Sequence, residues 1–239
     1  MAAKAQTVIV IGGNGYVGSR MCEQAILNGM NVVSISRSGT CPSWLKTSVW
    51  AQKVQWSKGD ALNIDSMRPY FNSNVRAVIS CVGCFHWKPS VMWAINGDTN
   101  INACDLAKES NIPRFVFVSA WRPWLIFDPI PSWNPISWIG RKILVPGYFG
   151  GKKKTEEVVE ANYGDNGICF RAGLVAGDRY ISETTAIPLG GWIPKLLSWV
   201  IPVVPVDTVA KAAIRFVQSD VPNTEQHICQ NEDIANFYA

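Results

Sequence analysis

The stretch Val8-Ile-Val-Ile-Gly-Gly-Asn-Gly-Tyr-Val-Gly18 decides the fold. Its four apolar residues predict a strand buried on both faces, and the pattern after Tyr16 predicts that a helix follows directly. The spacing Gly12-x-x-Gly15-x-x-Gly18 suits a sharp turn, a close approach of the backbone to a diphosphate, and tight helix–strand packing. The helix N-terminus offers its N–H groups to the phosphates. The stretch therefore predicts a dinucleotide-binding loop, and the alternative is a glycine turn that binds nothing.

Short apolar strands alternate with helical patterns along the chain. The predicted strands lie at 8–11, 31–36, 53–56, 76–81, 114–119 and 167–171. The predicted helices lie at 16–28, 65–71, 91–111, 148–163 and 207–218. Strands without a polar face, joined by helices, predict a doubly wound parallel sheet of the α/β class. We expect residues 1–173 to form this domain and residues 174–239 to form a small carboxyl-terminal lobe packed on it.

Composition excludes several functional classes. Of 239 residues, 48% are hydrophobic and 17% charged, which excludes a disordered chain. A net charge of +4 is too small to predict nucleic-acid binding. Cys81-x-x-Cys84 is one pair without the second half of a zinc site, and His86 and His227 stand alone, so we predict no metal. The longest apolar run, 196–206, is too short to span a bilayer.

Residues 121–147 interrupt the alternation with four tryptophans and five prolines. Proline at this density disfavours long helices and interior strands. Two interpretations stay open for this insert and for the segment 191–199. The rings cover an apolar lobe beside the cofactor, or they dock the protein onto a membrane complex or a lipid surface. In the second case Arg122, Arg141 and Lys142 would lie beside anionic groups.

The second predicted strand ends in Ser36-Arg37-Ser38. An NAD site tends to place an acidic residue here to bind the ribose 2′-hydroxyl. A guanidinium group between two hydroxyls instead suits a 2′-phosphate. The residues therefore favour NADP(H) over NAD(H), and the alternative is a solvated arginine.

With these residues the chain resembles the short-chain dehydrogenase/reductase superfamily in its atypical, extended branch, which has the Rossmann fold. The resemblance is carried by the glycine loop, Gly59-Asp60-Ala61, Asn96-Gly-Asp-Thr-Asn100, Arg171-Ala-Gly-Leu-Val175 and Val206-Asp-Thr-Val-Ala210. It implies that Asp60 contacts the adenine and that the turn after Arg171 lies against the nicotinamide. The cofactor-binding residues that it implies, together with the loop and the second strand, are Gly12, Asn14, Gly15, Tyr16, Val17, Gly18, Ser36, Arg37, Ser38, Asp60, Ala61, Cys81, Val82, Gly83, Tyr148, Lys152, Ala172, Gly173 and Val175.

The same motifs, with Ser80-Cys-Val-Gly83, are similar to an organellar subgroup of this superfamily. It includes the dinucleotide-binding accessory subunit of mitochondrial complex I, a fungal coenzyme-Q-synthesis-associated protein and plant plastoglobule relatives. The resemblance implies a protein peripheral to a mitochondrial or plastid membrane, without a transmembrane helix. Such a protein would hold its nucleotide for structural or regulatory reasons.

Tyr148 and Lys152 stand at i and i+4, so one helix face carries both. The resemblance implies that Tyr148 delivers a proton and that Lys152 lowers its pKa and binds the nicotinamide ribose. The third catalytic position falls on Ala120, unless Ser119 substitutes for it. The alternative is a surface tyrosine beside a solvated lysine. We expect Lys153, Lys154, Glu156 and Glu157 to form a solvated helix face.

Two functions follow from these observations. The first is an NADP(H)-binding accessory or assembly protein of an organellar membrane complex. The second is an active NADP(H)-dependent oxidoreductase or isomerase on a hydrophobic, quinone- or isoprenoid-like substrate, with Tyr148, Lys152 and Ser119 as catalytic residues.

Overall fold

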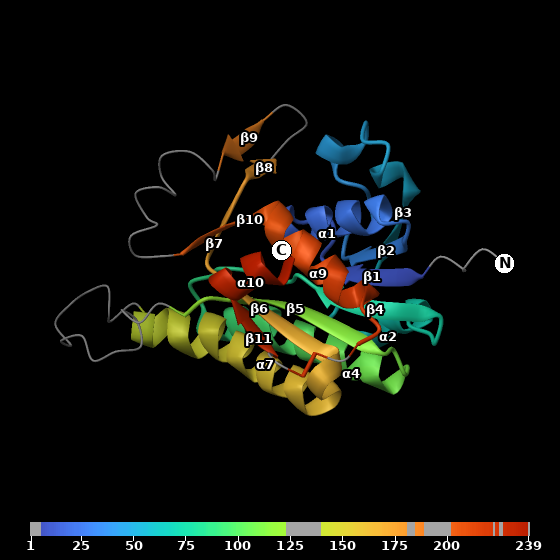
Figure 1. Cartoon of the computed structure of the whole chain (residues 1–239). Helices are drawn as coiled ribbons and strands as arrows, with labels where there is room; N and C mark the ends of the chain where they lie inside the picture. Colours follow the sequence, from blue (N-terminus) through green and yellow to red (C-terminus); the bar gives the residue numbers. More distant parts are fainter. Residues whose placement is uncertain are drawn as a thin grey trace.

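The computed structural model describes residues 6–122, 140–180, 185–188, 202–221, 223–224 and 227–238. In this part of the chain, seven parallel strands form one sheet in the order β11-β6-β5-β4-β1-β2-β3 (Figure 1). They are β1 (Thr7–Ile11), β2 (Asn31–Ser36), β3 (Val54–Lys58), β4 (Val75–Ser80), β5 (Arg114–Ala120), β6 (Gly167–Ala172) and β11 (Ile228–Gln230). The chain leaves the sheet at the β3 edge and re-enters at β4 on the other side of β1. The predicted doubly wound parallel sheet is therefore confirmed.

Helices cover both faces of this sheet (Figure 1). On one face α1 (Tyr16–Leu27) packs against α9 (Val206–Gln218), and on the other α4 (Thr99–Glu109) packs against α7 (Gly150–Tyr163). Each face has its own apolar core because alternate strand residues point to opposite sides. Val8, Val10 and Phe170 belong to the α1/α9 core, whereas Ile9 and Phe117 belong to the α4/α7 core.

The predicted helix at 91–111 is divided in the structure. It consists of α3 (Pro89–Trp93), a π-helical turn η4 (Ala94–Asp98) and α4. The Thr99 hydroxyl bonds the Ile95 carbonyl at 2.6 Å, and the Asn100 amide donates to the Asn96 carbonyl at 3.0 Å. Side chains that bond the preceding turn in this way compete with the regular ladder, which periodicity alone does not reveal. The wide turn also brings Gly97 against Gly151 of α7.

The tryptophan-rich insert lies mostly outside the described residues, so its predicted docking role is not visible. Its last part forms a π-helical segment η5 (Gly140–Phe149) with Pro146 inside it, where proline density predicted irregular chain. This segment runs directly into α7. No helix within the described ranges is both long and apolar enough to cross a membrane.

The carboxyl-terminal part contributes to the main layers as well as to small sheets. β7 (Leu174–Ala176) pairs with β10 (Val203–Pro205), and β8 (Asp178–Tyr180) pairs with β9 (Ala186–Pro188). After α9, β11 adds to β6 at the edge of the main sheet, and α10 (Asn231–Tyr238) packs on α9. The remaining short elements are α2 (Ile64–Met67) and the 3₁₀ turns η1 (Ser43–Leu45), η2 (Ala51–Lys53), η3 (Arg68–Tyr70) and η6 (Gly164–Asn166).

Candidate functional site

A cavity of about 630 Å³ opens at the carboxyl ends of β1, β2, β3 and β4. This is the point where the strand order reverses, at which doubly wound sheets bind their ligands. The residues that line it are Ile11, Gly12, Asn14, Gly15, Ile35, Ser36, Arg37, Ser38, Gly59, Asp60, Ala61, Leu62, Cys81, Val82, Gly83, Ile95 and Thr99. Five segments of the chain, four of which follow strands, thus meet in one place.

The glycine loop forms the floor of the cavity. Gly12 has a φ of +79°, which glycine adopts without strain, and its N–H donates to the Ile35 carbonyl at 2.9 Å. A Cβ on Gly18 would overlap the carbonyl oxygen of Gly12, so this position requires glycine for the helix to pack on the loop. The first turn of α1 contains no acidic residue. Its N–H groups and partial positive charge are therefore available to an anionic ligand.

The end of β2 supplies hydroxyl groups and one cation. The Ser36 and Ser38 hydroxyl oxygens lie 3.3 Å apart, and the Asn14 amide donates to Ser38 Oγ at 3.4 Å. Arg37 is exposed between them. Among the described lining residues, Arg37 is the one cation and Asp60, in the turn after β3, is the one acid. A guanidinium group beside two hydroxyl groups can bind an anionic group through charge-assisted hydrogen bonds.

Asp60 is held by the backbone of its own turn. Its N–H donates to Ser66 Oγ at 2.8 Å, and its Oδ1 accepts from the Leu62 N–H at 3.0 Å. The carboxylate therefore stays at the rim of the cavity next to buried Ala61. A carboxylate in this place can accept hydrogen bonds from an exocyclic amine.

Two buried asparagines position the segment that follows β4. Asn100 accepts from the Ser80 hydroxyl at 2.6 Å and donates to the Val82 carbonyl at 3.3 Å. Asn96 accepts from the Cys84 N–H at 3.2 Å and donates to the Cys84 carbonyl at 2.8 Å. The backbone of Cys81, Val82 and Gly83 is thereby fixed along the cavity wall. Burial raises the pKa of the Cys81 thiol to about 12, so this thiol is unreactive at neutral pH.

Tyr148 and Lys152 lie beside the end of this wall. The Lys152 ammonium lies 5.6 Å from the centroid of the Tyr148 ring, and its Nζ donates to the Val118 carbonyl at 2.8 Å. A Cβ on Gly83 would lie 3.6 Å from Nζ. Burial lowers the pKa of Lys152 to about 8, although the Glu156 carboxylate opposes this change. Burial also raises the pKa of Tyr148 to about 12.

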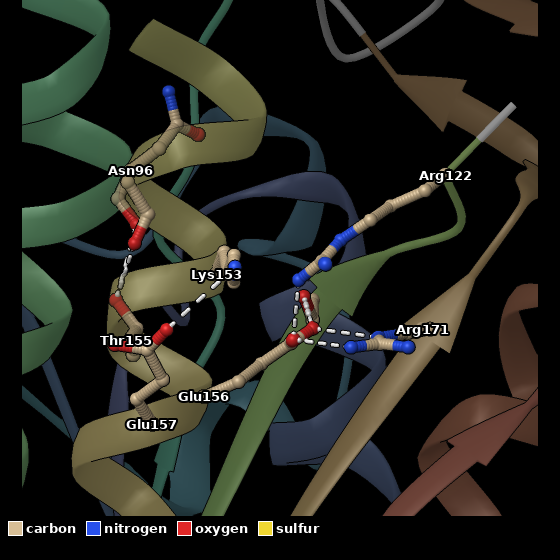
Figure 2. Close-up of polar contacts among 9 residues, drawn as sticks. Asn96, Arg122, Lys153, Thr155, Glu156, Glu157 and Arg171 are labelled. Atoms are coloured by element: carbon tan, nitrogen blue, oxygen red, sulfur yellow. Dashed lines mark hydrogen bonds and ion pairs between the residues drawn. The ribbon is translucent and has the colours of Figure 1, made fainter. Parts of the chain in front are cut away.

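Ser119 does not point to the tyrosine but to a buried ionic cluster. Its hydroxyl donates to Glu156 Oε1 at 2.6 Å. Arg122 bonds Glu156 Oε2 at 2.6 Å, and Arg171 bonds the same carboxylate through two nitrogens at 3.0 and 2.7 Å. Figure 2 shows both guanidinium groups converging on Glu156. The expectation that Glu156 belongs to a solvated face is wrong: its side chain is 4% exposed, whereas Glu157 pairs with Lys154 at the surface.

The remaining predicted residues lie next to the cavity without lining it. The Tyr16 hydroxyl reaches the Val175 carbonyl at 3.5 Å, and Val17 packs against the α1/α9 core. Gly173 donates its N–H to Asn231 Oδ1 at 2.8 Å, and the Ala172 carbonyl accepts from the Trp121 N–H at 2.8 Å. The structure therefore gathers the adenosine and diphosphate side of the predicted site and leaves these residues at its border.

Sequence reasoning missed several residues of this region. Leu62, Ile95 and Thr99 line the cavity, and Asn96 and Glu156 position its neighbours. The Asn96–Asn100 motif contained the signal for two of them, Asn96 and Thr99, whereas nothing local distinguished Glu156 from Glu157. Within the described ranges, no group of three or more histidine, cysteine or acidic side chains could hold a metal ion.

Comparison with known proteins agrees with this geometry. Residues 8–122 match the model of the NAD dependent epimerase/dehydratase family. The chain is 34% identical over 181 residues to an uncharacterised chloroplastic protein of Arabidopsis thaliana, covering 75% of this chain and 54% of that protein. It is 41% identical over 75 residues to MIOREX complex component 2 of Saccharomyces cerevisiae, covering 30% of this chain and 27% of that protein. The chain thus spans about half or less of these relatives.

Solved structures show the same fold at low sequence identity. Vestitone reductase from alfalfa aligns with a TM-score of 0.67 and 19% identity, over 94% of this chain and 76% of that one. UDP-glucose 4-epimerase from Bifidobacterium longum, in complex with NAD+ and UDP, aligns with a TM-score of 0.65 and 16% identity, over 94% and 77%. WbmH from Bordetella bronchiseptica, in complex with NAD+, aligns with a TM-score of 0.62 and 17% identity, over 96% and 87%. The amino-terminal part of the chain therefore matches the NAD dependent epimerase/dehydratase family, and the described chain has the Rossmann-type α/β fold of short-chain dehydrogenases/reductases.

Proposed function

We propose that the chain binds a nicotinamide dinucleotide in the cavity above the glycine loop, and that it prefers NADP(H) to NAD(H). The observation that carries the preference is the end of β2, where Arg37 lies between two hydroxyl groups. None of the cavity-lining residues at this strand end is acidic. The matching family and the neighbours that were solved with NAD+ support the nucleotide class. When bound, the nicotinamide would supply hydride transfer, and the bound nucleotide would stabilise the fold.

We infer that the principal role is that of a peripheral accessory or assembly subunit of an organellar membrane complex, of the respiratory complex I type. The Ser119 hydroxyl is engaged by Glu156, and the next strand residue is Ala120. A missing oxyanion-type donor typically lowers a rate by about 10²–10³. Of the relatives, one is named chloroplastic and another is named a component of a complex, which supports an organellar setting. The membrane or complex contact is assigned to the tryptophan-rich insert.

A second function is favoured by the buried lysine. Lys152 lies on the helix face of Tyr148, and its pKa, lowered to about 8, allows it to exchange a proton near neutral pH. In an oxidoreductase or isomerase acting on a hydrophobic substrate, Tyr148 would donate the proton and Lys152 would bind the ribose and stabilise the phenolate. Arg122 and Arg171 both pair with the Glu156 carboxylate near this lysine.

The nucleotide preference is tested by charge reversal at Arg37. We expect Arg37→Glu to weaken the binding of NADPH much more than the binding of NADH, because a charge-assisted bond contributes about 1.5–3 kcal/mol. Isothermal titration calorimetry measures both affinities. Arg179→Glu, on the exposed strand β8, is the matched control and should change neither affinity. Equal losses for NADPH and NADH would refute the 2′-phosphate assignment.

Turnover separates the two functions. Tyr148→Phe should still bind NADPH under both, because the glycine loop and Arg37 are unchanged. If the chain is an enzyme, this variant loses the proton donor, and NADPH oxidation with a carbonyl substrate falls by about 10²–10⁴. If the chain is an accessory subunit, the variant still co-purifies with its complex and the wild type shows no turnover. Turnover by the wild type that Tyr148→Phe abolishes would contradict the accessory role.

A further inference from the structure

Phe85 occupies an unusual place beside Tyr148. Its ring stacks on the Tyr148 ring with centroids 4.2 Å apart and an interplanar angle of 17°. The residue is nevertheless 70% exposed, so only one of its faces is covered. An exposed phenylalanine that stacks on a partly buried tyrosine covers that tyrosine more than it stabilises a core.

The backbone on the two sides of Phe85 is held very differently. Cys84 is fixed in both directions by the buried Asn96 side chain. After it, residues 85–88 form no helix or strand, and within the described part of the chain no backbone hydrogen bond ties Phe85. The Phe85 side chain can therefore turn about the fixed Cys84 without disturbing Val82 and Gly83, which line the cavity.

Two residues that follow Tyr148 in the chain also contact its ring. Phe149 meets its ring edge-on at 5.0 Å, and the Lys152 ammonium lies 5.6 Å from its centroid. Of these contacts, the Phe85 ring is the one that can leave, because its outer face is exposed. The face of Tyr148 that it covers accepts a flat ring, since the two rings stack nearly parallel.

We propose that Phe85 is a swinging cover of Tyr148, and that the site beneath it takes a ligand with a flat, apolar, conjugated ring, which replaces the Phe85 ring on Tyr148. Phe85 thereby determines which molecules reach the phenol. When Phe85 swings away, Tyr148 loses its stacking partner, and a flat conjugated ring restores that contact. A saturated ring does not. The inference rests on the proposed placement of Tyr148 at the ligand site, but it requires no turnover.

The cover is tested by the chemical accessibility of Tyr148. N-acetylimidazole acetylates accessible tyrosines, and peptide mapping by mass spectrometry gives the rate at each one. Phe85→Ala should raise the acetylation rate at Tyr148 about fivefold, because loss of one stacking contact raises the population of uncovered Tyr148 by about this factor. Phe85→Trp keeps an aromatic ring and should not raise the rate. Trp87→Ala, from an 81% exposed position on the same loop, is the matched control, and Tyr180, 38% exposed, is the internal reference. Equal rates at Tyr148 in the wild type and Phe85→Ala would overturn the proposal.

The ligand class is tested in the Phe85→Ala protein. Naphthalene-2-carboxamide should slow acetylation of Tyr148 back to the wild-type rate, and cyclohexanecarboxamide at the same concentration should not. Protection by neither compound, or equal protection by both, would overturn the assignment of a flat ring. NADPH affinity should be the same in wild type and Phe85→Ala, because Phe85 does not line the cavity. A wild type that fails to bind NADPH would refute the nucleotide proposal and leave the acetylation result unaffected.

Discussion

Lys152 is a buried amine, and its positive charge is unfavourable for the stability of the folded protein. Burial lowers its pKa from 10.5 to about 8, so the folded protein holds its proton less tightly than the unfolded chain. Between these values the unfolded chain binds more protons, and stability rises with pH. Below pH 8 both states are protonated and the full cost of about 3 kcal/mol is present.

Lys152→Met removes this cost. We expect the free energy of unfolding of the variant to exceed that of the wild type most at pH 7, and the difference to shrink as the pH approaches 10. Urea denaturation of the two proteins at both pH values measures it. The variant lacks the hydrogen bond to the Val118 carbonyl at every pH. This loss therefore shifts the stability difference between the two proteins by a constant amount and does not change how the difference depends on pH. A difference that is independent of pH would refute the lowered pKa.

At the residue scale, sequence reasoning succeeds where one segment contains its own explanation. The glycine loop, Arg37 and Asp60 each follow a predicted strand, so their place at the sheet edge was predictable. The burial of Glu156 on α7 was not predictable, because its partners Arg122, just after β5, and Arg171, on β6, are distant in the sequence. The local sequence pattern does not indicate that the Glu156 carboxylate is neutralised by arginines from other parts of the chain.

At the scale of elements, the end of α9 is capped by arginines from two strands. Arg114, 2% exposed, donates to the Phe216 and Val221 carbonyls at 3.1 and 2.8 Å. Its guanidinium also lies 4.7 Å from the centroid of the Phe216 ring. Arg76 donates to Val217 and Ser219 in the same way. The last carbonyls of a helix lack intrahelical partners, so these arginines tie α9 to the sheet.

Arg114→Met should therefore destabilise the protein, since it leaves two carbonyls near the core without their donor. We expect a loss of about 2–4 kcal/mol in the free energy of unfolding, measured in guanidinium chloride. Arg68→Met removes the exposed pair with Glu109 and is the control, for which we expect little change. Equal effects of the two substitutions would refute the capping role of Arg114.

Strands were easier to predict than helices in this chain. β5 is buried at all seven positions, so an apolar run indicates it directly. The break at η4 was not predictable, because it arises from side chains that bond carbonyls of the preceding turn. The same holds for η5, where a proline lies inside helical chain.

At the scale of the whole molecule, the proposed nucleotide site joins segments that follow β1, β2, β3 and β4. A ligand that binds only the folded protein stabilises it, by about 2.7 kcal/mol at 100 times its dissociation constant. We expect NADPH to raise the midpoint of thermal unfolding, and NADH at the same concentration to raise it less. Differential scanning fluorimetry measures both. Adenosine 2′-monophosphate is the control that carries the 2′-phosphate without the nicotinamide. If none of the three ligands raised the midpoint of thermal unfolding, the proposed nucleotide site would be refuted.

The order of the central strands was predictable, because alternating strands and helices leave few arrangements. The position of β11 was not. Its three residues contain no long apolar run, and they pair with β6 only after the chain has passed through two small sheets and α9.

This pairing has a consequence during synthesis. β6 ends at Ala172 and β11 begins at Ile228, so the ribosome releases the first long before the second. Until then the backbone amides and carbonyls along the outer side of β6 have no neighbour, and a nascent chain presents them to any other polypeptide. Translation pauses between the two strands would thus lengthen the interval in which chaperones have to shield the growing protein.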